Sequence, residues 1–247
     1  MPAKKNVKKT AKKKTSRVKK SQSKPPITKT ELKTLVRQLE KESDVNYDAY
    51  ESTAEDYYKK MHVLGDAEIH ARDEFLSHVR HGGLILDVGC GPGRDAKYFV
   101  SQGFRVIGID MSPKMVRIAR REVQHAEFHV MDFLDMEFPN EFADAIWFNS
   151  SLLLVEKHYA PFILKEMRDI LKPKGIIYIS LSEGKGQGVL HDAKHDVKKF
   201  YAFYDKKEAE LLLKDGFRIL AMYDTRQAEF KPPSRHQKWF AILAQKK

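Results

Sequence analysis

Short apolar runs alternate along this chain with longer stretches in which apolar residues recur every three or four positions. The short runs are bounded by glycine, proline or polar residues and predict buried strands at 84–88, 104–109, 128–131, 143–148 and 176–181. Helical spacing between them predicts helices over 93–102, 113–119 and 157–171. Strands that alternate with helices indicate a parallel sheet covered by helices on both faces. The pattern therefore predicts an α/β fold, closed by an antiparallel pair of strands at 217–222 and 239–244.

Capping signals mark the starts of several helices. Ser112 followed by Pro113 is an N-cap with proline at the first helical position, and Asp205 opens another helix. Thr28 and Glu31 form a capping box ahead of an apolar helical face that ends at 39. Two more helical stretches are expected at about 45–61 and 66–79, whereas the polar segment 183–204 is expected to be a loop.

A glycine-rich loop joins the first strand to the first of these helices. Gly89, Gly91 and Gly93 stand at alternate positions, which lets the backbone turn sharply and lets a ligand approach closely. Asp110 ends the next strand, where an acid accepts hydrogen bonds from a ribose diol. A glycine triplet alone is also compatible with a tight turn that binds nothing. Together with Asp110, it predicts a nucleoside-cofactor site at the carboxyl edge of the sheet.

The spacing of these glycines resembles one family in particular. A dinucleotide fingerprint reads G-x-G-x-x-G, whereas this loop reads G-x-G-x-G. Asp87 and the three glycines match the D/E-x-G-x-G-x-G motif of the class I S-adenosylmethionine-dependent methyltransferases. The resemblance covers about residues 47–245, and further local matches lie at Tyr50-x3-Ala54-x2-Tyr57, 130–133, 142–146 and 171–179. One departure, Lys174 in place of a glycine, affects a turn.

The resemblance implies a fold and a set of cofactor-binding residues. The fold would be a Rossmann-like, doubly wound, seven-stranded sheet, mostly parallel, with a C-terminal antiparallel strand pair. S-adenosyl-L-methionine would be the cofactor, with Asp110 on its ribose and the glycines beneath its methionine part. The residues expected to bind it are Asp87, Gly89, Gly91, Gly93, Asp110, Met111, Asp132, Phe133, Asn149, Tyr57 and Arg72. For Arg72, a solvent-facing helix charge is an equally good interpretation, and no metal ligand is expected.

The acceptor of the methyl group is much less well defined. Candidate acceptor-side residues follow the fourth and fifth strands or lie in the polar segment beyond them: Asn149, Ser150, Ser151, Glu183, His191 and His195. The Asn/Asp-Pro-Pro-Tyr/Phe motif of enzymes that methylate amines in nucleic acid is missing after 148. We therefore expect a methyltransferase with a small-molecule acceptor.

Three other functions stay open. The first is a methyltransferase that acts on nucleic acid or protein recruited by a basic tail, and the second is a cofactor-binding scaffold without turnover. A nicotinamide-dependent oxidoreductase is disfavoured by the glycine spacing.

Charge divides the chain into two parts. Residues 1–33 contain twelve Lys, one Arg and one Glu, a balance of +12, so the rest of the +11 chain balances at −1. A lysine-rich segment with few large apolar side chains cannot bury enough surface to fold. We expect a disordered basic tail at 1–26 and a methyltransferase domain at 27–247, with a helical lid at 27–80 and the Rossmann-like core at 84–247. Residues 1–24 could contact nucleic-acid phosphates without sequence preference, or could serve only to keep the protein soluble.

The rest of the composition bears on where in the cell the protein is expected. The chain has 247 residues, 42% of them hydrophobic, which is enough for one sizeable domain. It shows no signal peptide and no apolar run long enough to insert into a membrane. The single cysteine, Cys90, fits a reducing compartment and is best interpreted as a small packing residue. We expect an intracellular, cytoplasmic protein, or a nuclear one if the source is eukaryotic.

Overall fold

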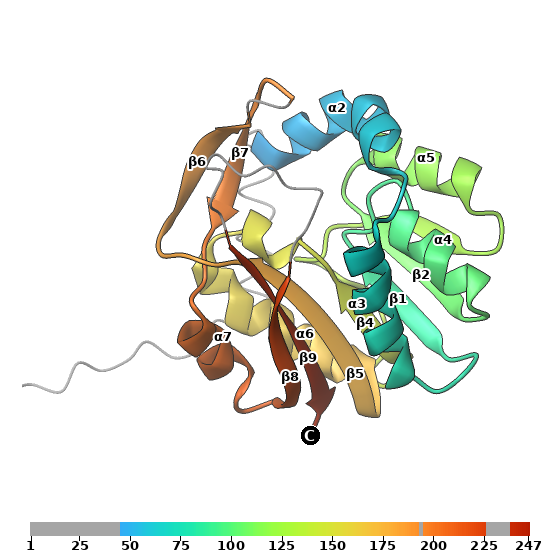
Figure 1. The fold of residues 1–247 in the computed structure, drawn as a ribbon, viewed down its shortest axis with the longest axis vertical. Helices are drawn as coiled ribbons and strands as arrows, with labels where there is room; N and C mark the ends of the chain where they lie inside the picture. The colour runs from blue at the N-terminus through green and yellow to red at the C-terminus, as the bar shows by residue number, and fades with distance from the viewer. Residues whose placement is uncertain (1–44, 193–194, 226–237) are drawn as a thin grey trace, which may run out of the picture.

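A seven-stranded sheet forms the centre of the computed structural model, which describes residues 45–192, 195–225 and 238–247 (Figure 1). Its strand order is β3-β2-β1-β4-β5-β9-β8. The strands are β1 Leu84–Val88, β2 Arg105–Asp110, β3 Glu127–Val130, β4 Ala143–Phe148, β5 Leu171–Ser182, β8 Phe217–Thr225 and β9 Trp239–Lys246. β1 to β5 are parallel, and β9 runs antiparallel to both β5 and β8. The Rossmann-like α/β fold with its closing antiparallel pair is confirmed.

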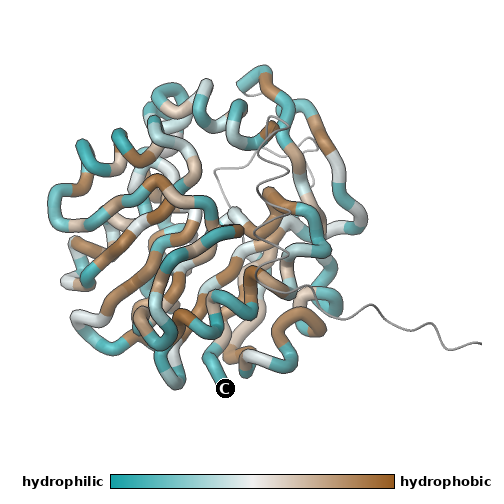
Figure 2. Tube along the Cα trace, turned by 180° about the vertical axis from the view of Figure 1, so that it is seen from behind, coloured by the Kyte–Doolittle hydropathy of each residue, from teal (hydrophilic) through white to brown (hydrophobic). Residues whose placement is uncertain are grey.

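Helices cover both faces of this sheet and bury two apolar cores. On one face, Phe75 and Phe99 pack with side chains of the sheet in one core; on the other, Ile163 and Leu213 belong to a second core. The first face carries α3 Asp66–Ser77, α4 Arg94–Ser101 and α5 Pro113–Glu122, and the second carries α6 Ala160–Ile170 and α7 Lys206–Leu213. Figure 2 shows the most hydrophobic segments running mainly through the interior strands.

The helix starts follow from the capping residues. The Ser112 hydroxyl accepts a hydrogen bond from the Met115 amide at 3.1 Å, and the Asp205 carboxylate accepts one from the Glu208 amide at 2.9 Å. Both predicted caps are confirmed. The helix predicted over 157–171 is interrupted at its start: a short 3-10 turn, Lys157–Tyr159, precedes α6, and the residue after α6, Leu171, already belongs to β5.

Helix α2, Val45–Met61, lies across the carboxyl ends of the strands, at the top of Figure 1. Asn46 ties its first turn to the fold, because its side chain donates to the Leu154 carbonyl at 2.8 Å and accepts from the Phe200 amide at 3.0 Å. Further along, the Glu51 carboxylate accepts from the Ser112 hydroxyl at 2.6 Å. The helix is therefore fixed at both sides of the sheet edge that it covers.

The segment 183–204 is not the loop that its polarity predicts. It contains a β-hairpin, β6 Gln187–Asp192 and β7 Val197–Ala202, which packs against α2 (Figure 1). Lys199 of β7 is 1% exposed, so a lysine occupies a position that a hydrophobicity pattern assigns to solvent. The loop prediction is wrong because the inner face of this hairpin is partly polar, and the buried Lys199 is neutralised by Asp192 on the neighbouring strand.

The fifth strand also begins earlier than predicted. β5 starts at Leu171, so the expected turn at 171–175 lies within the strand, beside a register shift opposite 143–145. Lys174 has φ of +61°, in the left-handed region that glycine adopts without strain. This explains why the resembling family has a glycine there.

Several expectations concern residues that lie outside the described ranges. These are the basic tail at 1–26, the capping box at Thr28 and the first part of the proposed 27–80 lid. Within the ranges that are described, no helix is long and apolar enough to cross a membrane.

We predict that Phe99→Ala destabilises the domain by about 3–5 kcal/mol, because it removes a fully buried ring from the core under the glycine loop. Phe99 packs at ring-centroid distances of 5.6 Å from Phe75 and 5.2 Å from Trp147. Chemical denaturation would measure the change, with Leu211→Ala, at a side chain 63% exposed, as the control. A loss for Phe99→Ala no larger than that of the control would contradict this account of the core.

Candidate functional site

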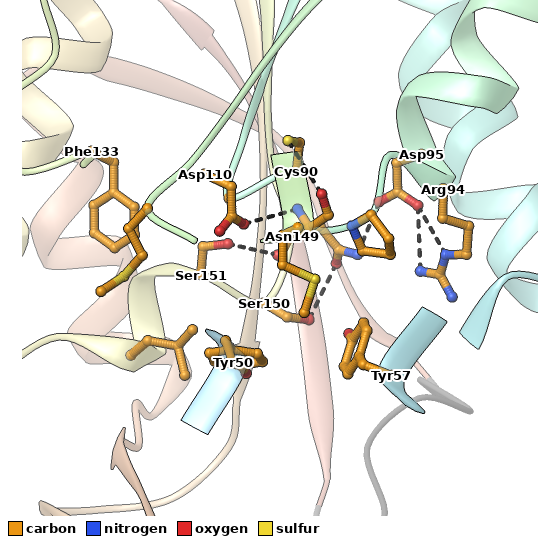
Figure 3. A pocket seen from close by; sticks show the side chains of 16 residues that line it. Tyr50, Tyr57, Cys90, Arg94, Asp95, Asp110, Phe133, Asn149, Ser150 and Ser151 are labelled. Carbon is orange, nitrogen blue, oxygen red and sulfur yellow. Dashed lines mark hydrogen bonds and ion pairs between the residues drawn. The ribbon is translucent and has the colours of Figure 1, made fainter. Parts of the chain in front are cut away.

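A pocket opens where β1, β2 and β4 end, beneath α2 (Figure 3). It holds roughly 800 Å³ of space, its open mouth included. Its lining combines the glycine loop, the residues after β2 and β4, and two tyrosines of α2: Tyr50, Tyr57, Gly89, Cys90, Gly91, Pro92, Arg94, Asp95, Asp110, Met111, Met115, Phe133, Asn149, Ser150, Ser151 and Leu154. Ligands bind at this edge of open α/β sheets, so the pocket lies where the strand pattern places a site.

Asp110 is held in place by backbone amides. One carboxylate oxygen accepts from the Gly91 amide at 2.9 Å, and the other accepts from the Ser112 amide at 2.9 Å. Burial raises the pKa of Asp110 to about 6, although these two hydrogen bonds oppose the shift. Each oxygen keeps a lone pair for a further donor. The side chain is therefore a fixed acceptor, ionised at neutral pH, at the edge of the pocket.

Two positions of the loop suit glycine, but for different reasons. Gly89 has φ of +72°, and a Cβ there would overlap the Ser151 side chain. Gly91 has φ of +52°, and a Cβ there would meet no atom within 4 Å. The open space beside Gly91, which lines the pocket, is the space that a ligand in close contact with the backbone would fill.

Asp95, in the first turn of α4, is the centre of a buried polar network. Its Oδ2 accepts from the Trp147 indole nitrogen at 2.5 Å, and its Oδ1 accepts from Arg72 and lies 3.3 Å from the Arg94 Nε. Burial alone would raise the pKa of Asp95, but the two guanidinium groups hold it well below its usual range. Arg94 also lies 3.2 Å from Glu68. An ionised carboxylate is thus maintained at the pocket wall.

The turn after β4 presents neutral polar groups. Asn149 Oδ1 accepts from the Ser180 hydroxyl at 2.6 Å, and its Nδ2 donates to Asp95 at 3.3 Å. Ser150 has φ of +55°, a strained value for a residue with a side chain, and its amide donates to Ser180 Oγ at 2.8 Å. Ser151 is buried, and its hydroxyl donates to the Val88 carbonyl at 3.3 Å. These bonds fix the turn against β1 and β5.

Two tyrosines of α2 cover the pocket on the side away from Cys90 (Figure 3). The rings of Tyr50 and Tyr57 meet edge to face at 6.0 Å. Burial raises the pKa of both phenols, so both are neutral at physiological pH. Phe133 and Met115 add apolar surface to the lining. The pocket thus has polar groups on its sheet side and aromatic groups on its α2 side.

Some residues expected to bind the cofactor do not line this pocket. These are Asp87, Gly93, Asp132 and Arg72. Asp87 lies behind the loop with an exposed fraction of 2%, and burial, with Asp95 nearby, raises its pKa well above the usual value. Arg72 is 2% exposed and bound to Asp95, so the interpretation as a solvent-facing charge is wrong. The other seven lie together in the pocket: Gly89, Gly91, Asp110, Met111, Phe133, Asn149 and Tyr57.

The acceptor-side candidates separate into two groups. Asn149, Ser150 and Ser151 line the pocket, whereas Glu183, His191 and His195 do not. His191 is exposed on the outer side of the hairpin, 2.9 Å from Asp196. The His195 side chain is only 4% exposed, so it is not a solvated surface histidine, and its Nδ1 lies 3.0 Å from Asp192.

The sequence reasoning missed Arg94 and Asp95 as pocket residues. Both come directly after the glycine loop, at the start of α4, so their position in the motif was the available signal. Met115 and Leu154 were also missed, because apolar residues carry no chemical signature. Among the residues that the structure describes, no group of three or more histidines, cysteines or acids could hold a metal ion.

Comparison with known proteins finds similarity to methyltransferases. Residues 85–175 match the family model described as methyltransferase domain. A curated relative, trans-aconitate 2-methyltransferase of Escherichia coli O139:H28, is 29% identical over 101 residues. That match covers 40% of this chain and 39% of the relative, so the chain spans about two fifths of the length of the curated relatives it matches.

Solved structures extend the likeness over most of the chain. The 1,6-didemethyltoxoflavin-N1-methyltransferase of Burkholderia thailandensis, solved with 1,6-didemethyltoxoflavin and S-adenosylhomocysteine, has a TM-score of 0.63 at 20% identity, covering 91% of this chain and 92% of that one. Magnesium protoporphyrin IX methyltransferase of Synechocystis PCC 6803, solved with S-adenosylmethionine, has a TM-score of 0.58 at 17% identity, covering 87% and 97%. At these identities the structures establish the fold alone, and the match to the methyltransferase domain model covers residues 85–175, which include the glycine loop and Asp110.

Proposed function

We propose that this protein binds S-adenosylmethionine in the pocket beneath α2 and transfers its methyl group to a small-molecule acceptor. The observation that carries the proposal is the Asp110 carboxylate, which two backbone amides hold at the pocket edge beside the open space at Gly91. An ionised acceptor of this kind suits a ribose diol. The loop has no need to bind phosphate, which S-adenosylmethionine lacks.

The other pocket residues suit the remaining parts of this cofactor. Met111 and Phe133 offer an apolar slot for adenine, and Gly89 and Gly91 allow the methionine part to lie against the backbone. The amino-terminal end of α4 favours its carboxylate, and Asp95 favours its amino group. Tyr57 closes the pocket from α2. Asp87, Asp132 and Arg72 stay proposals as cofactor residues, and we assign Arg72 the role of holding Asp95.

When bound, S-adenosylmethionine supplies a methyl group already activated for displacement. The protein's task is then to hold the acceptor in line with that group and to exclude water, and positioning of this kind contributes roughly 7–11 kcal/mol. Helix α2 excludes water, because Tyr50 and Tyr57 cover the pocket and Asn46 and Glu51 anchor the helix. We extend this lid to residues 27–80, and Asn149 and Ser150 are the acceptor-side residues that we favour.

The small-molecule acceptor is supported by the relatives, whose names give trans-aconitate and 1,6-didemethyltoxoflavin as their substrates. It is also supported by the missing Asn/Asp-Pro-Pro-Tyr/Phe motif after β4. An acceptor recruited through the basic tail, or a scaffold without turnover, is the alternative. We place the protein in a reducing, intracellular compartment on the strength of its single cysteine.

The proposed activity is tested with purified full-length protein and methyl-labelled S-adenosylmethionine, incubated with cell extract before and after nuclease and protease digestion. We expect label in material that passes a small-pore filter, unaffected by either digestion. S-adenosylhomocysteine should bind in calorimetry and NAD should not. Binding of NAD alone, or label only in nucleic acid or protein, would refute the proposal.

Asp110→Ala should weaken S-adenosylhomocysteine binding by roughly tenfold to a hundredfold, because it removes hydrogen bonds to a charged acceptor worth about 1.5–3 kcal/mol. Calorimetry measures the affinity, and circular dichroism verifies the fold. Asp196→Ala, at a side chain 94% exposed, is the control. An unchanged affinity in folded Asp110→Ala would remove Asp110 from the binding site.

Cofactor affinity should depend on pH through Asp110. Its pKa of about 6 lies above the unfolded value, so protonation below pH 6 stabilises the free protein, whereas a ribose hydroxyl needs the ionised form. The affinity for S-adenosylhomocysteine should therefore be constant above about pH 7 and fall, by up to tenfold per pH unit, below about pH 6. Calorimetry between pH 5 and 8 checks this. Asp110→Asn should bind weakly and lose this part of the dependence, and the same slope in both proteins would assign the titration elsewhere.

The basic tail should carry any nucleic-acid affinity of this protein. Its contacts would be to phosphates, so log affinity should fall with log salt at about −0.9 per phosphate neutralised, with little sequence preference. Filter binding across a salt series, on two unrelated DNA sequences, compares the full chain with a variant lacking residues 1–26. Equal binding by the truncated protein would place the contact on the folded domain.

A further inference from the structure

We propose that the acceptor side of the pocket takes an uncharged or cationic molecule with an apolar body and rejects carboxylate-rich acceptors. This inference rests on the proposed methyltransferase function, because that function divides the pocket into two sides. The glycine loop, Asp110, Met111 and Phe133 form the cofactor side. We take as the acceptor wall five lining residues that belong to α2 and to the segment after β4: Tyr50, Tyr57, Asn149, Ser150 and Leu154.

The acceptor wall carries no charge. Tyr50 and Tyr57 are partly buried phenols whose raised pKa keeps them neutral, and Leu154 is aliphatic. Asn149 and Ser150 are neutral and are both bound to Ser180. Aromatic faces attract apolar rings and cations, and they offer nothing to a carboxylate. The wall itself therefore favours a neutral or cationic acceptor.

The cation that lines the pocket is already paired with acidic side chains. Arg94 is the one cationic residue of the described lining, and it lies between two acids, 3.2 Å from Glu68 and 3.3 Å from Asp95. Its side chain is only 10% exposed. An anionic acceptor would have to compete with both acids for this guanidinium.

A second cation, Lys199, stands close to the wall but outside the pocket. Its ammonium lies 2.9 Å from Asp192 and 4.3 Å from the centre of the Tyr50 ring, and its side chain is 2% exposed. Lys199 therefore acts on Tyr50, the wall residue, rather than on the acceptor. Asp192 neutralises its charge, and the ring contact helps to hold Tyr50 in position.

The transfer step itself also favours a neutral acceptor. In the transfer, an acceptor lone pair forms the new bond to the methyl carbon while the carbon–sulfur bond breaks, and its electron pair stays on sulfur. A neutral amine becomes cationic at this step and can release its proton to water afterwards. The aromatic faces of Tyr50 and Tyr57, which line the pocket, attract that developing positive charge. A carboxylate acceptor would gain nothing comparable here.

The test uses three probes with the same apolar body: 2-naphthylmethylamine, 2-naphthalenemethanol and 2-naphthoate. Full-length protein is first saturated with S-adenosylhomocysteine, and ligand-observed NMR titrations then measure each dissociation constant at neutral pH. We expect the amine and the alcohol to bind at least about tenfold more tightly than the carboxylate. Equal affinities, preferred binding of the carboxylate, or no binding of any probe would each overturn the inference.

A positive charge placed on the acceptor wall should change the order of the probe affinities. Leu154→Arg supplies an uncommitted cation and should bring 2-naphthoate to at least the affinity of the alcohol, whereas the matched Leu154→Met should keep the original order. Thermal unfolding verifies that both variants fold. An unchanged probe order in folded Leu154→Arg would show that the wall does not select by charge. Failure of S-adenosylhomocysteine to bind the wild-type protein would instead count against the proposed function, and this is measured first on the same sample.

Discussion

One buried carboxylate, Asp95, holds together the parts of the structure that surround the pocket. It joins Arg72 of α3, Arg94 of α4 and the indole of Trp147 on β4, elements that are distant in sequence. A carboxylate taken out of water is costly unless its charge and its lone pairs are compensated, and here they are. Removing any one partner would leave buried charge behind. The position of α3 against the glycine loop therefore depends on this electrostatic balance as much as on apolar packing.

The sequence alone predicted the structure correctly wherever a feature depends on residues close to it in the chain. The order of apolar runs predicted the strands, and the caps at Ser112 and Asp205 predicted helix starts, because each signal lies within a few residues of its effect. The glycine loop and Asp110 were predicted for the same reason: strands that end at one sheet edge bring their terminal residues together. These signals located the part of the pocket lining that lies at the sheet edge.

The sequence was insufficient where the burial of a charged residue depends on an ion pair that the hydrophobicity pattern does not show. Arg72 and Lys199 look like surface charges, and both are buried because Asp95 and Asp192 neutralise them. The β6–β7 hairpin was missed for this reason, since its inner face is partly polar and shows no clean alternation. The backbone gives a second example. Lys174 has a positive φ, which the local pattern assigns to a turn, but the residue lies within strand β5.

The two sides of the pocket are built from separate stretches of chain. The glycine loop and the strand ends that carry Asp110 and Phe133 fall within residues 84–133, whereas the opposite wall comes from α2 and the turn after β4, backed by the hairpin inserted between β5 and α7. Substitutions on the pocket face of α2, away from the Glu51–Ser112 contact, therefore alter one wall without removing the hydrogen bonds that hold Asp110. Two chains can share this sheet edge and its glycine loop and still differ in what they bind, because a fold does not determine a function.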